Sequence, residues 1–85
     1  MTEVKAILYA WCSKQKLNPN YEVTPAGGGR GRAKFRCEIR VDNHDYVGMG
    51  MSGSKKDAMT NAAMDFCQYL IREGLMQPSE VPNLD

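Results

Sequence analysis

The sequence predicts an α+β fold of the type α-β-β-β-α, with two helices packed on one face of a three-stranded antiparallel sheet. Apolar residues recur at helical spacing near both ends of the chain, alternate with polar residues in the middle, and are separated by clusters of turn residues. This order is typical of α+β domains in which the helices cover one sheet face. Because 85 residues suffice for one core only, we expect a single domain over residues 1–76. A tail, or the start of a linker, is expected over residues 77–85.

The first predicted element is an amphipathic helix over residues 4–17. Its apolar positions recur every three or four residues, at Val4, Ile7, Leu8 and Trp11. The following segment, Asn18–Asn20, contains a proline between two asparagines, which favours a turn and forbids continuation of the helix.

Three strands are expected between the helices. A short one spans Tyr21–Thr24, and a second one, over Ala33–Val41, alternates between apolar and charged residues. The turn residues Asp42–Asp45 lead to a third strand over Tyr46–Met51, whose two glycines fall on the same face. Between the first two strands, residues 25–32 are so rich in glycine that we expect a flexible loop.

The second helix is predicted to begin after Ser54, because Ser54 with Asp57 three residues later fits a capping box. It is expected to end at Gly74. The apolar and small residues between them recur at helical spacing, at Ala58, Ala62, Ala63, Phe66, Tyr69 and Leu70. We expect the alanines to let this helix lie close to the sheet. The expected core consists of Trp11, Phe35, Ile39 and Phe66. The tail is expected either to pack through its apolar residues or to remain loose, and these are Leu75, Met76 and Val81.

The composition excludes several classes of function. No apolar run approaches the roughly 20 residues of a membrane span, and the N-terminus lacks the layout of a secretory signal, which favours an intracellular protein. Cys12, Cys37 and Cys67 are far apart and His44 is the one histidine, so buried thiols are favoured over a metal site. No hydrolase motif or nucleotide-binding loop is present. We therefore expect a non-enzymatic domain without cofactor or metal.

Positive charge is concentrated in the middle of the chain. The net charge of +1 consists of +1 over residues 1–25, +3 over residues 26–60 and −3 over residues 61–85. This asymmetry predicts a basic surface that faces a polyanion, although such a run is more often a solvated face.

Lys55 and Lys56 are the strongest candidates for contact with a polyanion. They fall in the first turn of the second predicted helix, where free N–H groups and the helix dipole already attract an anion. Two lysines at this place oppose the dipole, a cost that is easier to explain if an anion usually lies nearby. Taken alone, the pair is interpreted equally well as two solvated lysines.

Two further groups support the same interpretation. Lys5 and Tyr9 lie one turn apart on the first helix, on the face predicted to be opposite its core residues, and suit a phosphate and a ribose hydroxyl. Arg30 and Arg32 project from the glycine-rich loop, and either enter a groove or remain solvated. The topology separates these groups and the lysine pair by distances that suit successive grooves of an A-form duplex.

The motifs around these residues resemble the double-stranded-RNA-binding domain family. Its signature is a Lys-Lys-x-Ala helix start followed by paired alanines, here Lys55–Ala58 and Asn61–Ala63, with Phe35–Ile39 upstream. The resemblance extends from about Val4 to Gly74. Three further segments are similar to the N-terminal domain of the RNA helicase A and maleless helicases, namely Val4–Cys12, Asp65–Phe66 and Glu80–Pro82.

This resemblance implies a module that binds double-stranded RNA by its A-form shape, 2′-hydroxyls and phosphates, largely independently of sequence. It implies three contact regions: the first helix, the loop between the first two strands, and the start of the second helix. On this chain they correspond to Lys5 and Tyr9, to Arg30 with Arg32, and to Lys55 with Lys56. The chain departs from the family pattern at Ala10, in the Gly-Arg-Gly-Arg loop and at Met59, so we expect moderate affinity from one domain.

The helicase resemblance implies more about the parent protein. It suggests a monomeric module that recruits RNA to an ATP-dependent RNA helicase of the nucleus and cytoplasm. Two alternatives stay open. One is a domain of the same fold that binds protein partners through its exposed sheet face and has little or no affinity for RNA. The other is a fragment of an enzyme whose catalytic region lies outside these residues.

Overall fold

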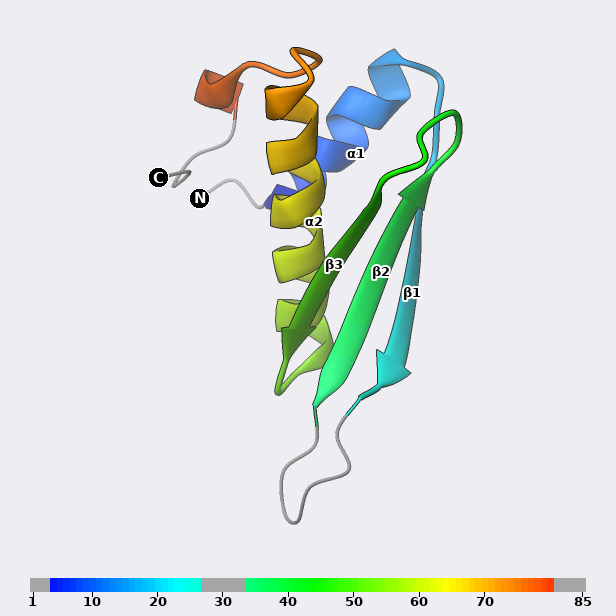
Figure 1. Cartoon of the computed structure of the whole chain (residues 1–85), viewed down its shortest axis with the longest axis vertical. Helices are drawn as coiled ribbons and strands as arrows, with labels where there is room; N and C mark the ends of the chain where they lie inside the picture. Colours follow the sequence, from blue (N-terminus) through cyan, green and yellow to red (C-terminus); the bar gives the residue numbers. More distant parts are fainter. Residues whose placement is uncertain (1–3, 27–33, 81–85) are drawn as a thin grey trace.

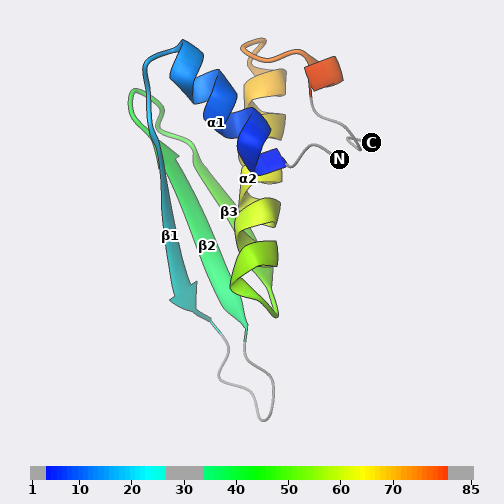
Figure 2. The ribbon, with the colours of Figure 1, turned by 180° about the vertical axis from the view of Figure 1, so that it is seen from behind.

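The computed structural model describes residues 4–26 and 34–80, and its elements follow the predicted order. These elements are α1 (Val4–Lys14), β1 (Pro19–Pro25), β2 (Phe35–Val41), β3 (Val47–Ser52), α2 (Lys55–Arg72) and a 3-10 turn, η1 (Pro78–Glu80). The strands form one antiparallel sheet in the order β1-β2-β3. Both helices lie on one face of this sheet (Figure 1), and the view from behind shows α1 beside α2 (Figure 2). The predicted fold class is confirmed.

The boundaries of the strands differ from the prediction by a few residues. Strand β1 pairs with β2 along its whole length, from Pro19 opposite Val41 to Pro25 opposite Phe35, and is therefore longer than expected. Prolines are tolerated at both of its ends because β1 lies at the edge of the sheet. Strand β3 begins and ends one residue later than predicted. The glycine-rich loop falls mostly on residues 27–33, outside the described residues.

Helix α1 ends at Lys14, three residues earlier than predicted. Lys16 adopts a left-handed conformation with φ of 59°, and the N–H of Leu17 donates to the carbonyl of Cys12 at 2.8 Å. Helix α2 ends in the same way, with φ of 75° at Gly74. This motif usually places glycine at the left-handed position. The end of α2 was therefore predictable, whereas a lysine in that position gave no signal for the end of α1.

Helix α2 lies flush against β3 because two glycines leave no side chain between them. A Cβ atom on Gly50 would overlap the backbone nitrogen of Ala62 and lie 2.6 Å from the carbonyl oxygen of Ala58. On Gly48, a Cβ atom would lie 2.9 Å from the carbonyl oxygen of Ala62. The predicted shared face of the two glycines is thus the face that α2 covers. This close contact sets how near α2 lies to β3 around Ala58 and Ala62.

The core lies between the helices and the sheet. Of the four residues expected there, Trp11, Ile39 and Phe66 are buried. Phe35 is only half-buried, because it opens β2 at the end of the sheet where α2 also begins, and it packs against the margin of the core. The buried hydrophobic residues of the described chain are Val4, Leu8, Trp11, Cys12, Cys37, Ile39, Val41, Ala58, Ala62, Ala63, Phe66, Cys67, Leu70 and Met76.

The segment after α2 folds back onto the helices. Met76 is buried, and the indole N–H of Trp11 donates to the carbonyl of Leu75 at 2.9 Å. The tail was expected either to pack through its apolar residues or to remain loose, and as far as Met76 it packs. Leu75 contributes its backbone, since its side chain remains 46% exposed. Val81 lies outside the described residues.

His44 joins both helices to the connection between β2 and β3. Its Nδ1 atom lies 3.3 Å from the hydroxyl of Tyr69, and its ring centroid lies 5.9 Å from that of Trp11 and 6.2 Å from that of Phe66. The sequence placed His44 in a turn beside acids. The tertiary structure gives it an aromatic environment from both helices, which is a packing role.

Candidate nucleic-acid interface

Lys55 and Lys56 form the first turn of α2, and both are exposed. The helix begins there because Ser54 acts as N-cap, with its hydroxyl accepting the N–H of Asp57 at 3.2 Å. This cap leaves the N–H groups of Lys55 and Lys56 at the free end of the helix, where an anion is favoured. The predicted helix start and the predicted position of both lysines are confirmed.

Lys55 also contacts the sheet. Its ammonium nitrogen lies 5.6 Å from the centroid of the Phe35 ring, a distance typical of a cation–π interaction. Phe35 is the first residue of β2 and pairs with Ser52, just before the α2 cap. The alternation of β2 indicated only a core residue at position 35. Twenty positions separate Phe35 from Lys55, so no local sequence pattern could reveal the contact.

Lys5 and Tyr9 occupy the flank of α1. Tyr9 is 62% exposed, whereas Lys5 is half-buried. The Lys5 ammonium lies near enough to Cys37 of β2 to oppose the rise that burial causes in the pKa of this thiol. Lys5 therefore lies closer to the margin of the core than Tyr9 does. The two residues are four positions apart and therefore share one face of α1.

The loop between β1 and β2 supplies the third predicted region. Arg30 and Arg32 lie outside the described residues. The base of the loop is closed by a hydrogen bond from the Ala26 N–H to the Lys34 carbonyl at 2.9 Å. This base lies at the end of the sheet where α2 begins (Figure 1). The structure thus brings the loop base and the lysine pair to one end of the molecule, with α1 farther along α2.

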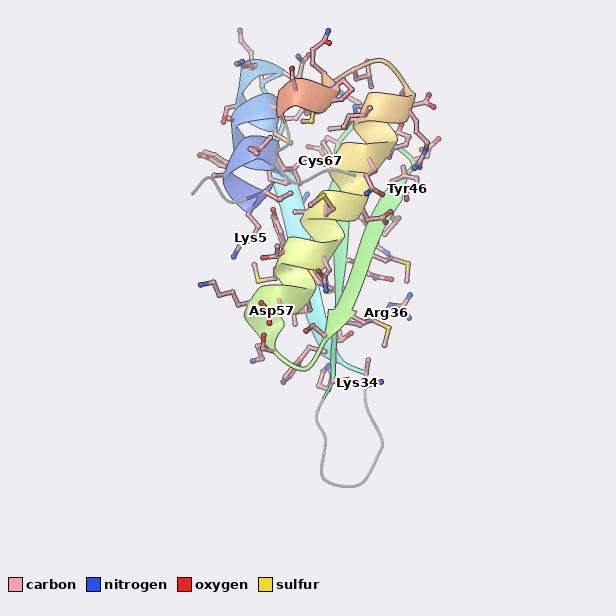
Figure 3. The ribbon with its side chains drawn as sticks, turned by 90° about the vertical axis from the view of Figure 1, so that its left-hand side faces the viewer. Lys5, Lys34, Arg36, Tyr46, Asp57 and Cys67 are labelled. Carbon is pink, nitrogen blue, oxygen red and sulfur yellow. The ribbon has the colours of Figure 1, made fainter. Side chains whose placement is uncertain are left out.

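The cations of the described residues differ in whether they form ion pairs. Arg36 and Arg40, on the outer sheet face, bind Glu38 at 3.0 and 3.3 Å, and Arg40 also lies 3.9 Å from Glu22. Within the described part of the chain, no lysine forms an ion pair. Figure 3 shows Lys5 on the helical side of the molecule and Arg36 on the opposite side. Among the described residues, the positive charge that no ion pair offsets is therefore carried by the lysines and by Arg72, whose guanidinium lies 5.9 Å from the centroid of the Tyr46 ring.

Other chemistry finds little support in the structure. Residues 4–26 and 34–80 contain no group of three or more His, Cys, Asp or Glu side chains placed to hold a metal ion. Cys12, Cys37 and Cys67 are free and buried. Burial raises the pKa of Cys12 to about 11 and, with the nearby thiols contributing, the pKa of Tyr21 to about 12, so these groups stay neutral at pH 7. No helix among the described residues is long and apolar enough to cross a membrane.

A comparison with known protein families agrees with this geometry. Residues 4–70 match the model of the double-stranded RNA binding motif. The match includes α1, the three strands and nearly all of α2, and therefore both helical regions that carry the candidate lysines. With the helix–sheet architecture and the unpaired lysines at the start of α2, it shows that the chain belongs to the double-stranded RNA binding motif family, a family of binding modules.

Proposed function

We propose that this domain grips A-form RNA through phosphates and 2′-hydroxyls, largely independently of base sequence. The main support is the exposed pair Lys55 and Lys56, which form no ion pair with any described residue and stand at the positive end of α2. Each ammonium can replace a condensed counterion on a phosphate. A pair of flexible ammoniums carries no information about bases, so shape and charge dominate recognition.

The other two regions would extend the contact along the duplex. Tyr9 is exposed with an aromatic ring and a hydroxyl, which suit a ribose in the wide minor groove of A-form RNA, and Lys5 beside it suits the adjoining phosphate. Arg30 and Arg32 are proposed to enter the groove next to the loop base. Domains of this kind span about 16 base pairs, two minor grooves and the major groove between them.

A titration against four nucleic acids tests this proposal. A duplex RNA of about 16 base pairs and a second one of scrambled sequence should bind with similar affinity. A DNA duplex of the same sequence and a single-stranded RNA should bind much more weakly, because neither offers regularly spaced 2′-hydroxyls across a wide minor groove. Equal affinity for the RNA and DNA duplexes would contradict the proposal.

We further propose that the domain recruits RNA to an RNA helicase of the nucleus and cytoplasm, as the resemblance of Val4–Cys12 and Asp65–Phe66 to such helicases suggests. Deleting the domain from its full-length protein should then raise the RNA concentration needed for half-maximal ATP hydrolysis and leave the rate at saturating RNA nearly unchanged. An equal loss of rate at all RNA concentrations would argue against a recruiting role.

A protein-binding role is the alternative outcome of these tests. The outer sheet face carries Met49 and Met51, which are 42% and 50% exposed. A domain that bound no duplex RNA even at low salt would favour that face as the functional surface. A monomeric state is also part of the proposal, and light scattering at binding concentrations would test it.

A further inference from the structure

The two lysines at the start of α2 have different surroundings. The ammonium of Lys55 lies over the half-buried ring of Phe35, 5.6 Å from its centroid. Lys56 makes no ring contact and no ion pair with any residue in ranges 4–26 and 34–80. Neither kind of contact restrains its side chain. The adjacent side chains therefore differ in their contacts although their sequence context is almost the same.

Phe35 is well placed to hold its partner still. It is paired across the sheet with Pro25 on one side and Ser52 on the other, so its backbone lies between two neighbouring strands. Ser52 is two residues before the Ser54 cap, which fixes the start of α2 beside the ring. Both partners of the cation–π contact thus lie at the start of a regular element, Phe35 in β2 and Lys55 in α2.

Contact with the ring is compatible with contact to a phosphate. An ammonium has three N–H donors, and only one side of it faces the ring. The ring attracts the charge without neutralising it, so the ammonium keeps N–H groups that can donate to a phosphate. Immobilising a lysine in the free protein removes part of the rotamer entropy that binding would otherwise cost.

We propose that Phe35 is a positioning residue that orders Lys55, and not Lys56, for phosphate binding. This inference rests on the proposed RNA-binding function, and it makes the two lysines unequal: Lys55 is ordered before RNA arrives, whereas Lys56 becomes ordered only in the complex. Phe35 itself touches no RNA.

A double-mutant cycle tests the proposal. Phe35→Leu keeps an apolar side chain at the margin of the core but removes the aromatic face. It should weaken binding to a 16-base-pair RNA duplex about three- to tenfold, the range expected for losing the order of one flexible side chain. In a Lys55→Ala background the same substitution should change the affinity less than twofold. In the matched Lys56→Ala background it should keep its full effect.

Two further measurements separate positioning from a general structural role. The slope of log affinity against log salt should fall by about one unit in Lys55→Ala and stay unchanged in Phe35→Leu, because the latter keeps the charge. Phe35→Trp, which retains a strong cation–π partner, should restore the parental affinity. In the free protein, NMR should show the Lys55 ε-protons shifted upfield by the ring, and Phe35→Leu should abolish that shift even if it lowers the melting temperature.

The outcomes distinguish the two proposals. Suppose that Lys55→Ala weakens RNA binding, and that Phe35→Leu weakens it by the same factor in the parental protein and in the Lys55→Ala background. The positioning role is then wrong and the RNA-binding function stands. An absence of the upfield shift in the free protein would overturn the positioning role in the same way. If Lys55→Ala and Lys56→Ala both bind RNA like the parent, the function proposed for this helix start fails, and the role of Phe35 fails with it.

Discussion

The lysine-bearing surface and the outer face of the sheet both present long cationic side chains to solvent, but they differ in how the charge is used. On the sheet, Arg36 and Arg40 share Glu38, and Arg40 also reaches Glu22. At the start of α2, Lys55 and Lys56 have no described acidic partner. Only the second surface has positive charge left for a polyanion, although the whole chain carries a net charge of only +1.

The comparison shows why net charge is a poor guide to partners. Glu22 and Glu38 lie directly opposite each other on β1 and β2, where like charges repel. The arginines on the same face offset this repulsion, so their positive charge stabilises the sheet. The distribution of ion pairs, rather than the number of cations, separates the proposed binding surface from the outer sheet face, whose charges are paired.

The largest expected effect comes from removing the scaffold that both surfaces share. Phe66 is fully buried and packs between α2 and the sheet. Phe66→Ala should cost roughly 3–5 kcal/mol, enough to unfold most molecules of so small a domain. Thermal unfolding followed by circular dichroism measures this, and a melting temperature equal to that of the parent would contradict the packing of α2.

The next effect should appear on the lysine surface alone. Replacing Lys55 and Lys56 by Ala should flatten the slope of log affinity against log salt by roughly two units, because about two phosphate contacts no longer release counterions. The melting temperature should stay near that of the parent, since both side chains are exposed. Unchanged affinity at both low and high salt would mean that the pair is merely a solvated face.

A smaller effect is expected on α1. Lys5→Ala should reduce the salt slope by about one unit, whereas Tyr9→Ala should weaken binding and leave the slope unchanged, because a ribose contact carries no charge. Binding titrations at four or more salt concentrations distinguish the two. A full unit of slope change in Tyr9→Ala would show that Tyr9 acts through its neighbours' charges.

The smallest effect on binding is expected on the outer sheet face. Arg40→Ala removes the same formal charge as Lys55→Ala, and so serves as its matched control. It should leave the RNA affinity nearly unchanged and lower the stability by about 0.2–1 kcal/mol, since the ion pairs of Arg40 are largely exposed. A loss of RNA affinity equal to that of Lys55→Ala would erase the distinction between the two surfaces.

Local patterns accounted for most of the elements. Alternation identified β2, and helical spacing with the Ser54 cap and Gly74 identified α2, because these signals act within a few residues of each other. The end of α1 was misjudged because Lys16 adopts a conformation that lysine rarely takes. The boundaries of β1 followed from pairing with β2, since a strand of seven residues with two prolines has little pattern of its own.

The candidate site divides in the same way. The position of Lys55 and Lys56 at a helix start follows from the order of residues around them, because a cap and the first turn it opens are adjacent in the chain. Three features required the fold: the half-burial of Lys5, the ring of Phe35 beneath Lys55, and the ion pairs that neutralise Arg36 and Arg40. The contacts of Lys5 and Lys55 join residues of separate elements. The ion pairs of Arg36 and Arg40 depend on which face of the sheet the helices leave exposed. Their geometry is decided by how α1, α2 and the sheet pack, and the glycines of β3 bring α2 close enough for that packing to occur.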